Sequence, residues 1–260
     1  MDTTEHNRNA WDKKVKEGSR YTQSVSSEII EKSKVGEWKI SVTTEKAVPR
    51  NWFPEDLTGI RILCLASGGG QQAPILAAAG ADVTVVDISQ RQLEQDEKLA
   101  KREGLRLKTL QGDMTNLSDF ENETFDFVVH PVSNLFVADV NPVWKEIARV
   151  LKNKGILIAG FTNPLLWIFD DSQEEKGILD VKYTIPSSTL DRLPETQVQD
   201  YLNGNQTIEY AHTLEDQIQG QIDAGFVITG FYEDDFGGSR LIDKYIKSFI
   251  ATRAMKVKMD

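Results

Sequence analysis

Short apolar runs alternate with amphipathic stretches through the middle of this 260-residue chain. The apolar runs are rich in branched side chains, which is typical of strands buried on both faces of a sheet. The stretches between them have the spacing of amphipathic helices. Alternation of this kind predicts a parallel sheet with helices on both faces. The expected strands are 59–66, 81–87, 105–113, 124–130 and 156–161, and the expected helices are 71–80, 89–104 and 140–155.

Two of these helices have recognisable starts. Ser89 can cap the second helix, with Gln92 three residues on as in a capping box, and Gly104 can close it. Asn141 is the expected cap of the third helix, and Pro142 suits its first position. These signals support the helical interpretation of both stretches.

The alternation of strands and helices stops at residues 162–212, a long segment rich in amide and acidic side chains. Within it, 181–185 and 206–212 have the composition of a small hairpin. The alternation then resumes, with turn-forming residues between the last two expected strands. The resumed elements are a helix at 213–225 and strands at 226–234 and 248–255.

Three consecutive glycines, Gly68–Gly70, follow the first expected strand and precede a helix. Ligands of open parallel sheets bind outside the carboxyl ends of the strands, where glycine lets the backbone come close to them. Gly68, Gly70 and Ala73 also have the spacing of a dinucleotide-binding loop, with Asp87 about twenty residues further on. A carboxylate at that place can accept from two neighbouring ribose hydroxyls. The loop therefore predicts a ribose-containing cofactor without choosing among such cofactors.

The ends of the third and fourth strands add polar groups to the same edge of the sheet. Asp113 can accept from an adenine amino group, and Met114 can lie against the ring. His130 ends the fourth strand, and Ser133 and Asn134 follow it within reach of a polar substrate. These positions favour a nucleoside cofactor with a second ligand beside it.

Composition narrows the classes of partner. Hydrophobic residues make up 40% of the chain and charged residues 27%, as in a soluble globular protein. The net charge of −10 disfavours nucleic acid, whose binders carry a basic face. No apolar run approaches the ~18–20 residues of a membrane span, and the start of the chain lacks a secretory signal. The single cysteine, Cys64, suits a buried filler, so a cytoplasmic protein is expected.

Four segments together resemble the class I S-adenosylmethionine-dependent methyltransferases, in particular the small-molecule branch that includes the ubiquinone and menaquinone enzymes. They look like the cofactor loop, the ribose-binding strand end, the adenine contact and the helix–turn–strand after the active-site strand. The segments are "ILCLASGGG" (62–70), "VTVVDIS" (83–89), "GDM" (112–114) and "RVLKNKGILI" (149–158). The resemblance covers about residues 57–161 and, less sharply, 213–257.

The resemblance implies an α/β, Rossmann-like fold with a seven-stranded, mostly parallel sheet whose last strand is antiparallel, and with helices on both faces. It implies S-adenosylmethionine as cofactor and S-adenosylhomocysteine as product. The methyltransferase core would be 57–161 and 213–260. An N-terminal lid segment, 1–56, and an inserted substrate cap, 162–212, would lie outside it. Both outer parts are rich in aromatic residues, and residues about 1–30 and 162–212 are expected to meet above the site.

The resemblance also assigns the cofactor contacts. The family's loop has an acidic residue early, whereas this loop has none. The amino group of the methionine moiety is therefore expected to be held by backbone carbonyls and by His130 or a lid residue. The expected cofactor contacts are Ala66, Ser67, Gly68, Gly69, Gly70, Gln71, Asp87, Ile88, Gln92, Asp113, Met114 and His130.

The chemistry asked of such a protein is modest, because the donor brings the reactivity and the protein mainly orients the acceptor and excludes water. A general base is needed only for a weakly acidic acceptor. His130, at the expected place of the methyl group, and His212, before the helix capped by Thr213, are the candidate catalytic residues. No metal motif is expected. The candidate substrate contacts are Trp11, Tyr21, Ser133, Asn134, Asn163 and Tyr210.

The predicted function is therefore methyl transfer to a small-molecule acceptor by in-line displacement. A nicotinamide-dependent oxidoreductase would use the same glycines and Asp87, but it gives Asp113 no role and needs a catalytic Tyr/Lys or His/Asp arrangement. A non-catalytic S-adenosylmethionine-binding protein would keep the cofactor pocket but lack a substrate cavity.

Overall fold

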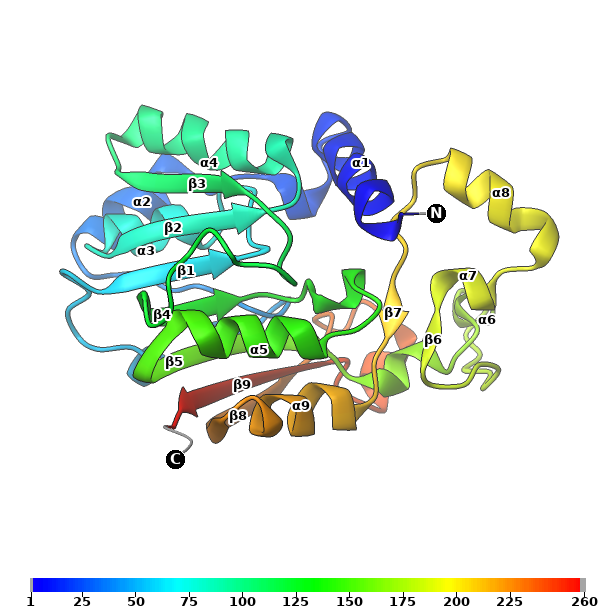
Figure 1. The fold of residues 1–260 in the computed structure, drawn as a ribbon. Coiled ribbons are helices and arrows are strands. Elements are labelled where there is room, and N and C mark those ends of the chain that lie inside the picture. The colour runs from blue at the N-terminus through cyan, green and yellow to red at the C-terminus, as the bar shows by residue number, and fades with distance from the viewer. Residues whose placement is uncertain (1, 258–260) are drawn as a thin grey trace.

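A seven-stranded sheet forms the centre of the computed structural model, which describes residues 2–257 (Figure 1). The strand order is β3-β2-β1-β4-β5-β9-β8, and β9 runs antiparallel to both of its neighbours. The other pairings are parallel, so the expected sheet is confirmed. The strands are β1 (Arg61–Leu65), β2 (Asp82–Asp87), β3 (Leu107–Gln111), β4 (Phe125–His130), β5 (Leu151–Thr162), β8 (Phe226–Asp234) and β9 (Phe249–Lys256).

Apolar side chains cover both faces of the central strands. In β1, Ile62 and Cys64 point into one core and Leu63 and Leu65 into the other, as the alternation of a strand requires. Cys64 lies opposite Val85 and is completely buried. A short, uniformly apolar run therefore marks a strand with helices on both sides.

Helices cover the two faces of the sheet, with α2, α3 and α4 on one side and α5 and α9 on the other (Figure 1). None of the helices within residues 2–257 is long and apolar enough to cross a membrane. The helices are α1 (Thr3–Lys16), α2 (Ser27–Lys34), α3 (Ala73–Ala78), α4 (Gln90–Glu103), α5 (Asn141–Val150), α6 (Asp171–Glu174), α7 (Thr189–Arg192), α8 (Glu195–Asn203) and α9 (Gly220–Asp223).

The ends of α4 lie where the sequence predicts them, whereas those of α5 do not. Ser89 accepts from the Gln92 amide at 3.2 Å, and Gly104 ends α4 in the left-handed conformation. The expectation that Asn141 caps α5 is wrong, because Asn141 is already helical and its amide donates to Asp139 Oδ1 at 2.9 Å. The helix also ends before the expected 155, since residue 151 begins β5.

The cap contains a small hairpin with a different partner from the expected one. β7 (Tyr210–Ala211) pairs antiparallel with β6 (Ser187–Ser188) rather than with 181–185. The expected partner lies elsewhere, because Val181 forms a bridge with Phe169. The helix expected at 213–225 is a π-helical turn, Glu215–Gln219, followed by α9.

The N-terminal 56 residues divide into two parts with different positions. Helix α1 lies over the carboxyl ends of the parallel strands (Figure 1). Residues 40–57 instead belong to the core, where Trp52 packs on β8 so closely that a Cβ added at Gly230 would lie 2.8 Å from the indole. Thus α1 lies over the strand ends, whereas much of 40–57 packs into the core.

Candidate active site

A cavity of about 1050 Å³ opens where the parallel strands end, under α1 and the cap. The segments that follow four strands form its floor, as expected for the ligand site of an open parallel sheet. These segments are 66–68, 87–88, 112–114 and 131–133. No group of three metal-binding side chains occurs among residues 2–257.

The glycine loop brings backbone against the end of β2. The Gly68 amide donates to Asp87 Oδ2 at 2.8 Å. A Cβ added at Gly68 would lie 2.7 Å from the Cβ of Gln92 and 3.0 Å from the Asp87 carboxyl carbon. Glycine is therefore needed here because a side chain would push the loop away from the carboxylate.

Asp87 is buried at the rim of the cavity and bonded on both oxygens. Its other oxygen, Oδ1, accepts from the Ser89 amide at 2.9 Å. Burial raises the pKa of Asp87 to about 6, against the effect of these backbone hydrogen bonds. Each carboxylate oxygen has a second lone pair, so the group can still accept from the two hydroxyls of a ribose.

A second buried carboxylate, Asp96, supports the same loop and was not expected from the sequence. Its Oδ2 accepts from the Gly69 amide at 2.9 Å, and burial raises its pKa to about 8. Neither Asp96 Oδ1 nor Gln92 Oε1 has a partner in the described part of the chain. The helical spacing of Leu93, Asp96 and Leu99, all buried, could have revealed it, because an acid on the apolar stripe of a helix needs a polar partner.

Helix α1 is attached to the start of α4. The Ser89 hydroxyl donates to Asp12 Oδ1 at 2.6 Å. Trp11, the residue before Asp12 on α1, meets the ring of Phe136 edge to face, with ring centroids 5.3 Å apart. The helix is thus held over the cavity both at the start of α4 and at the segment after β4.

The cap meets α1 from the other side. Asn7 forms a two-way contact with Ile208, donating to its carbonyl at 2.9 Å and accepting from its amide at 2.8 Å. Lys13 Nζ donates to the Gly204 carbonyl. The expectation that the N-terminal residues and the cap meet above the ends of the strands is confirmed by these contacts.

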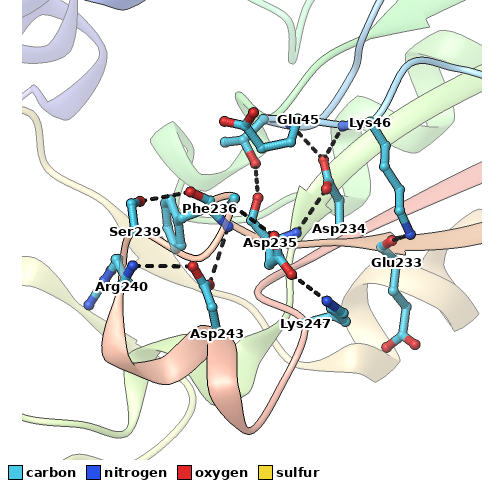
Figure 2. Close-up of polar contacts among 12 residues, drawn as sticks. Glu45, Lys46, Glu233, Asp234, Asp235, Phe236, Ser239, Arg240, Asp243 and Lys247 are labelled. Atoms are coloured by element: carbon cyan, nitrogen blue, oxygen red, sulfur yellow. Dashed lines mark hydrogen bonds and ion pairs between the residues drawn. The ribbon is translucent and has the colours of Figure 1, made fainter.

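Two segments that are distant in sequence contribute to one part of the cavity lining, and Figure 2 shows the polar contacts between them. The Asp234 carboxylate accepts from the Thr43 hydroxyl at 2.7 Å and from the amides of Glu45 and Lys46 at 2.8 Å. These bonds hold the loop after β8 against residues 43–46, and the same loop brings Phe236 to the cavity. Sequence patterns gave no sign of this pairing.

The two candidate catalytic histidines are buried and do not line the cavity. His130 Nδ1 lies 3.0 Å from the Leu65 carbonyl, and burial lowers the pKa of the ring to about 4. His212 Nε2 lies 3.2 Å from the Asn134 carbonyl, and burial lowers its pKa as well. Both rings are therefore neutral near pH 7 and hydrogen-bonded to backbone.

Most of the other expected site residues lie together. The lining includes most of the expected cofactor contacts and half of the expected substrate contacts. Those that line the cavity are Ala66, Ser67, Gly68, Gln71, Asp87, Ile88, Gln92, Asp113, Met114, Trp11, Tyr21 and Ser133. Those that do not are Gly69, Gly70, Asn134, Asn163 and Tyr210. The Gly69 amide donates to Asp96, and the side chains of Asn134, Asn163 and Tyr210 donate to Gln217, Lys247 and Thr3.

Comparison with known proteins gives the family. A model described as a methyltransferase domain matches residues 63–159. The YbaJ protein of Bacillus subtilis, described as an uncharacterized methyltransferase, is 53% identical over 252 residues, which are 97% of this chain and 98% of that protein. The chain belongs to the methyltransferase family. The resemblance indicated by the four sequence segments is thereby confirmed.

More distant relatives of this methyltransferase share its core. A demethylmenaquinone methyltransferase of Clavibacter sepedonicus is 32% identical over 128 residues, covering 49% of this chain and 48% of that protein. An S-adenosylmethionine-dependent methyltransferase of Mesorhizobium loti has a TM-score of 0.61 at 17% identity, covering 80% of this chain and 95% of that structure. The methyltransferase described here thus has the fold of the S-adenosylmethionine-dependent enzymes.

Proposed function

We propose that this methyltransferase transfers the methyl group of S-adenosylmethionine to a small-molecule acceptor by in-line displacement. The observation that carries the proposal is the position of Asp87, buried at the end of β2, facing the cavity and bonded to the backbone of Gly68. A carboxylate next to a glycine loop can accept hydrogen bonds from the ribose diol, while the loop lets the backbone come close to the ligand.

The residues around the cavity fit the cofactor. Asp87 would hold the ribose hydroxyls, Asp113 and Met114 would contact the adenine, and the backbone of 66–68 would lie along the methionine part. When bound, the cofactor supplies a methyl group that is already activated by the sulfonium. The glycine loop admits it because a Cβ at Gly68 would fill the space next to Asp87.

The remaining task of the chain is to orient the acceptor and to keep water out. Helix α1 and the cap cover the cavity, and the Trp11–Phe136 contact closes one side of it. A covered cavity of this kind orients a small acceptor for in-line attack and removes competing water. His130 acts as a positioning residue, because its bond to the Leu65 carbonyl joins the ends of β4 and β1.

Several properties favour a small molecule over a nucleic acid as acceptor. The net charge is −10, and the cavity that would hold the acceptor lies under α1 and the cap rather than on an open basic surface. The single, completely buried cysteine suits a reducing compartment, so we place the enzyme in the cytoplasm.

Isothermal titration tests this function directly. S-adenosylhomocysteine should bind with a dissociation constant in the micromolar range or below. A micromolar constant corresponds to a binding free energy of about −8 kcal/mol. NAD should give no binding heat under the same conditions. Binding of NAD without binding of S-adenosylhomocysteine would instead support an oxidoreductase.

A further inference from the structure

A carboxylate in the cap, Glu209, lines the same cavity as the glycine loop. Both backbone groups of Glu209 are hydrogen-bonded to Thr189. The Glu209 amide donates to Thr189 Oγ1 at 3.1 Å, and the Glu209 carbonyl accepts from the Thr189 amide at 2.8 Å. The position of this side chain is therefore set by the hairpin of the cap rather than by a mobile loop.

The carboxylate of Glu209 is only half satisfied. Oε1 accepts from the Thr207 hydroxyl at 3.1 Å. Oε2 has no donor in residues 2–257, and it is not enclosed, because Glu209 lines the cavity. Burial raises the pKa of this group, which reflects the cost of holding the charge away from water.

The two cations nearest to Glu209 are engaged elsewhere. Lys14 Nζ donates to Thr207 Oγ1 at 3.2 Å and lies 4.8 Å from the centre of the Trp11 ring. The Arg192 guanidinium lies 4.4 Å from the centre of the Trp167 ring and donates to the Ser188 carbonyl. Both lower the pKa of Glu209 from a distance, but neither forms an ion pair with it in the described structure.

We propose that Glu209 binds the ammonium group of the methyl acceptor, so that the substrate is an amine with an apolar or aromatic body. This inference rests on the proposed function, because it assigns a substrate class to the acceptor part of the same cavity. An ammonium group gives the open oxygen a charge-assisted hydrogen bond, which is roughly twice as strong as a neutral one. An anionic acceptor would be repelled by this carboxylate, and an alcohol would bring no positive charge to it.

The surroundings of Glu209 suit such a molecule. Trp11, Phe136 and Trp167 line the cavity and offer apolar surface for the body of the amine. The contacts of Glu209 come from the cap and α1 rather than from the glycine loop, so its carboxylate belongs to the acceptor side of the site.

Three probes of similar size that differ in one group test this substrate class. Phenethylamine, phenethyl alcohol and hydrocinnamate are titrated into the protein saturated with S-adenosylhomocysteine, and binding is followed by ligand-observed NMR. The amine should bind at least about tenfold more tightly than the alcohol or the acid, a difference of ~1.4 kcal/mol. Equal binding of the three, tighter binding of the acid, or no binding of the amine would overturn the proposal.

Two variants connect the preference to one side chain. Glu209→Gln keeps the shape and the bond to Thr207 but removes the charge, and it should abolish the preference for the amine. Asp171→Asn is the matched control, because Asp171 lines the same cavity but is already paired with Arg240 at 2.8 Å. It should keep the preference. A preference that survives Glu209→Gln would contradict the assignment.

The affinity for S-adenosylhomocysteine separates this inference from the proposed function. Glu209→Gln should leave that affinity unchanged within about twofold, since the carboxylate is assigned to the acceptor. A large loss would show that Glu209 holds the amino group of the cofactor instead. If the unmodified protein fails to bind S-adenosylhomocysteine at all, the proposed function fails, and the three probes are then compared without it.

Discussion

The Ser89 hydroxyl donates to the Asp12 carboxylate at 2.6 Å and so joins the N-terminal helix to the residue that caps α4. Ser89 also donates its amide to Asp87, the proposed ribose carboxylate. The hydrogen bonds thus run from α1 through Ser89 to the cofactor site, and the helix that covers the cavity is attached beside the group that binds the ligand.

Asp12→Ala should loosen this attachment. Without the carboxylate, α1 loses a charge-assisted hydrogen bond, and residues 3–16 should exchange their amide hydrogens faster. The affinity for S-adenosylhomocysteine should fall by about fivefold, or ~1 kcal/mol. Hydrogen exchange and titration measure the two effects. Lys16→Ala, on an exposed position of the same helix, is the control, and equal behaviour of the two variants would argue against the attachment.

Asp87→Asn should weaken cofactor binding strongly. The amide keeps the shape of the side chain but replaces one acceptor oxygen with a donor, so it cannot accept from both ribose hydroxyls and the two backbone amides. We expect the dissociation constant of S-adenosylhomocysteine to rise at least about tenfold, since hydrogen bonds to charged groups contribute roughly 1.5–3 kcal/mol. An unchanged constant in isothermal titration would remove Asp87 from the site.

Gly68→Ala should also weaken binding, for a steric reason. The added Cβ would lie 2.7 Å from Gln92 Cβ and 3.0 Å from the Asp87 carboxyl carbon, so the loop must move away from the carboxylate. Gly204→Ala is the control, because the contacts of its Cβ begin at 3.3 Å. Titration should show a loss of at least about tenfold for the first variant and none for the second. Similar affinities would mean that the loop tolerates a side chain.

The buried carboxylates predict that stability falls with rising pH. The pKa of Asp96 is raised to about 8, so the folded protein keeps a proton that the unfolded chain releases above its ordinary value near 4. The free energy of unfolding should therefore decrease between about pH 4 and pH 8, by up to ~1.4 kcal/mol per pH unit for one such group.

Urea unfolding of the ligand-free protein at several pH values in this range measures that slope. Asp96→Asn should flatten it, because the neutral amide has no proton to release. Some slope should remain, since the pKa of Asp87 is raised to about 6. Glu97→Gln, exposed on the same helix, should leave the slope as it is. A steep slope in Asp96→Asn would place its origin elsewhere.

The sequence predicts the core of this fold well because local chemistry and burial agree there. The cap of α4 at Ser89 and its end at Gly104 follow from the preferences of single residues, and the apolar runs follow from burial on both faces. Asn141 shows the limit of such reasoning, because it is already part of the helix and its own amide donates to Asp139. The choice between two nearby polar residues depends on the path of the preceding chain.

Other parts of the site could not be predicted because they depend on contacts between distant residues. Asp234 bonds to the amides of residues 45 and 46, which carry no sequence signal for an acidic partner. His130 occupies the expected strand end, yet its ring turns inward to the Leu65 carbonyl rather than toward the cavity. The sequence pattern indicates where a strand ends, whereas the orientation of the last side chain of that strand depends on contacts with the neighbouring strand.

The packing of Trp52 against β8 has a consequence for synthesis of the chain on the ribosome. Its indole needs the backbone of Gly230, and its carbonyl accepts from Arg253 at 3.3 Å, so both partners are made about 180 to 200 residues later. Trp52 therefore has no complete packing site until the last strands leave the exit tunnel. During that interval its indole is open to chaperones, and a stalled or truncated product would expose it permanently.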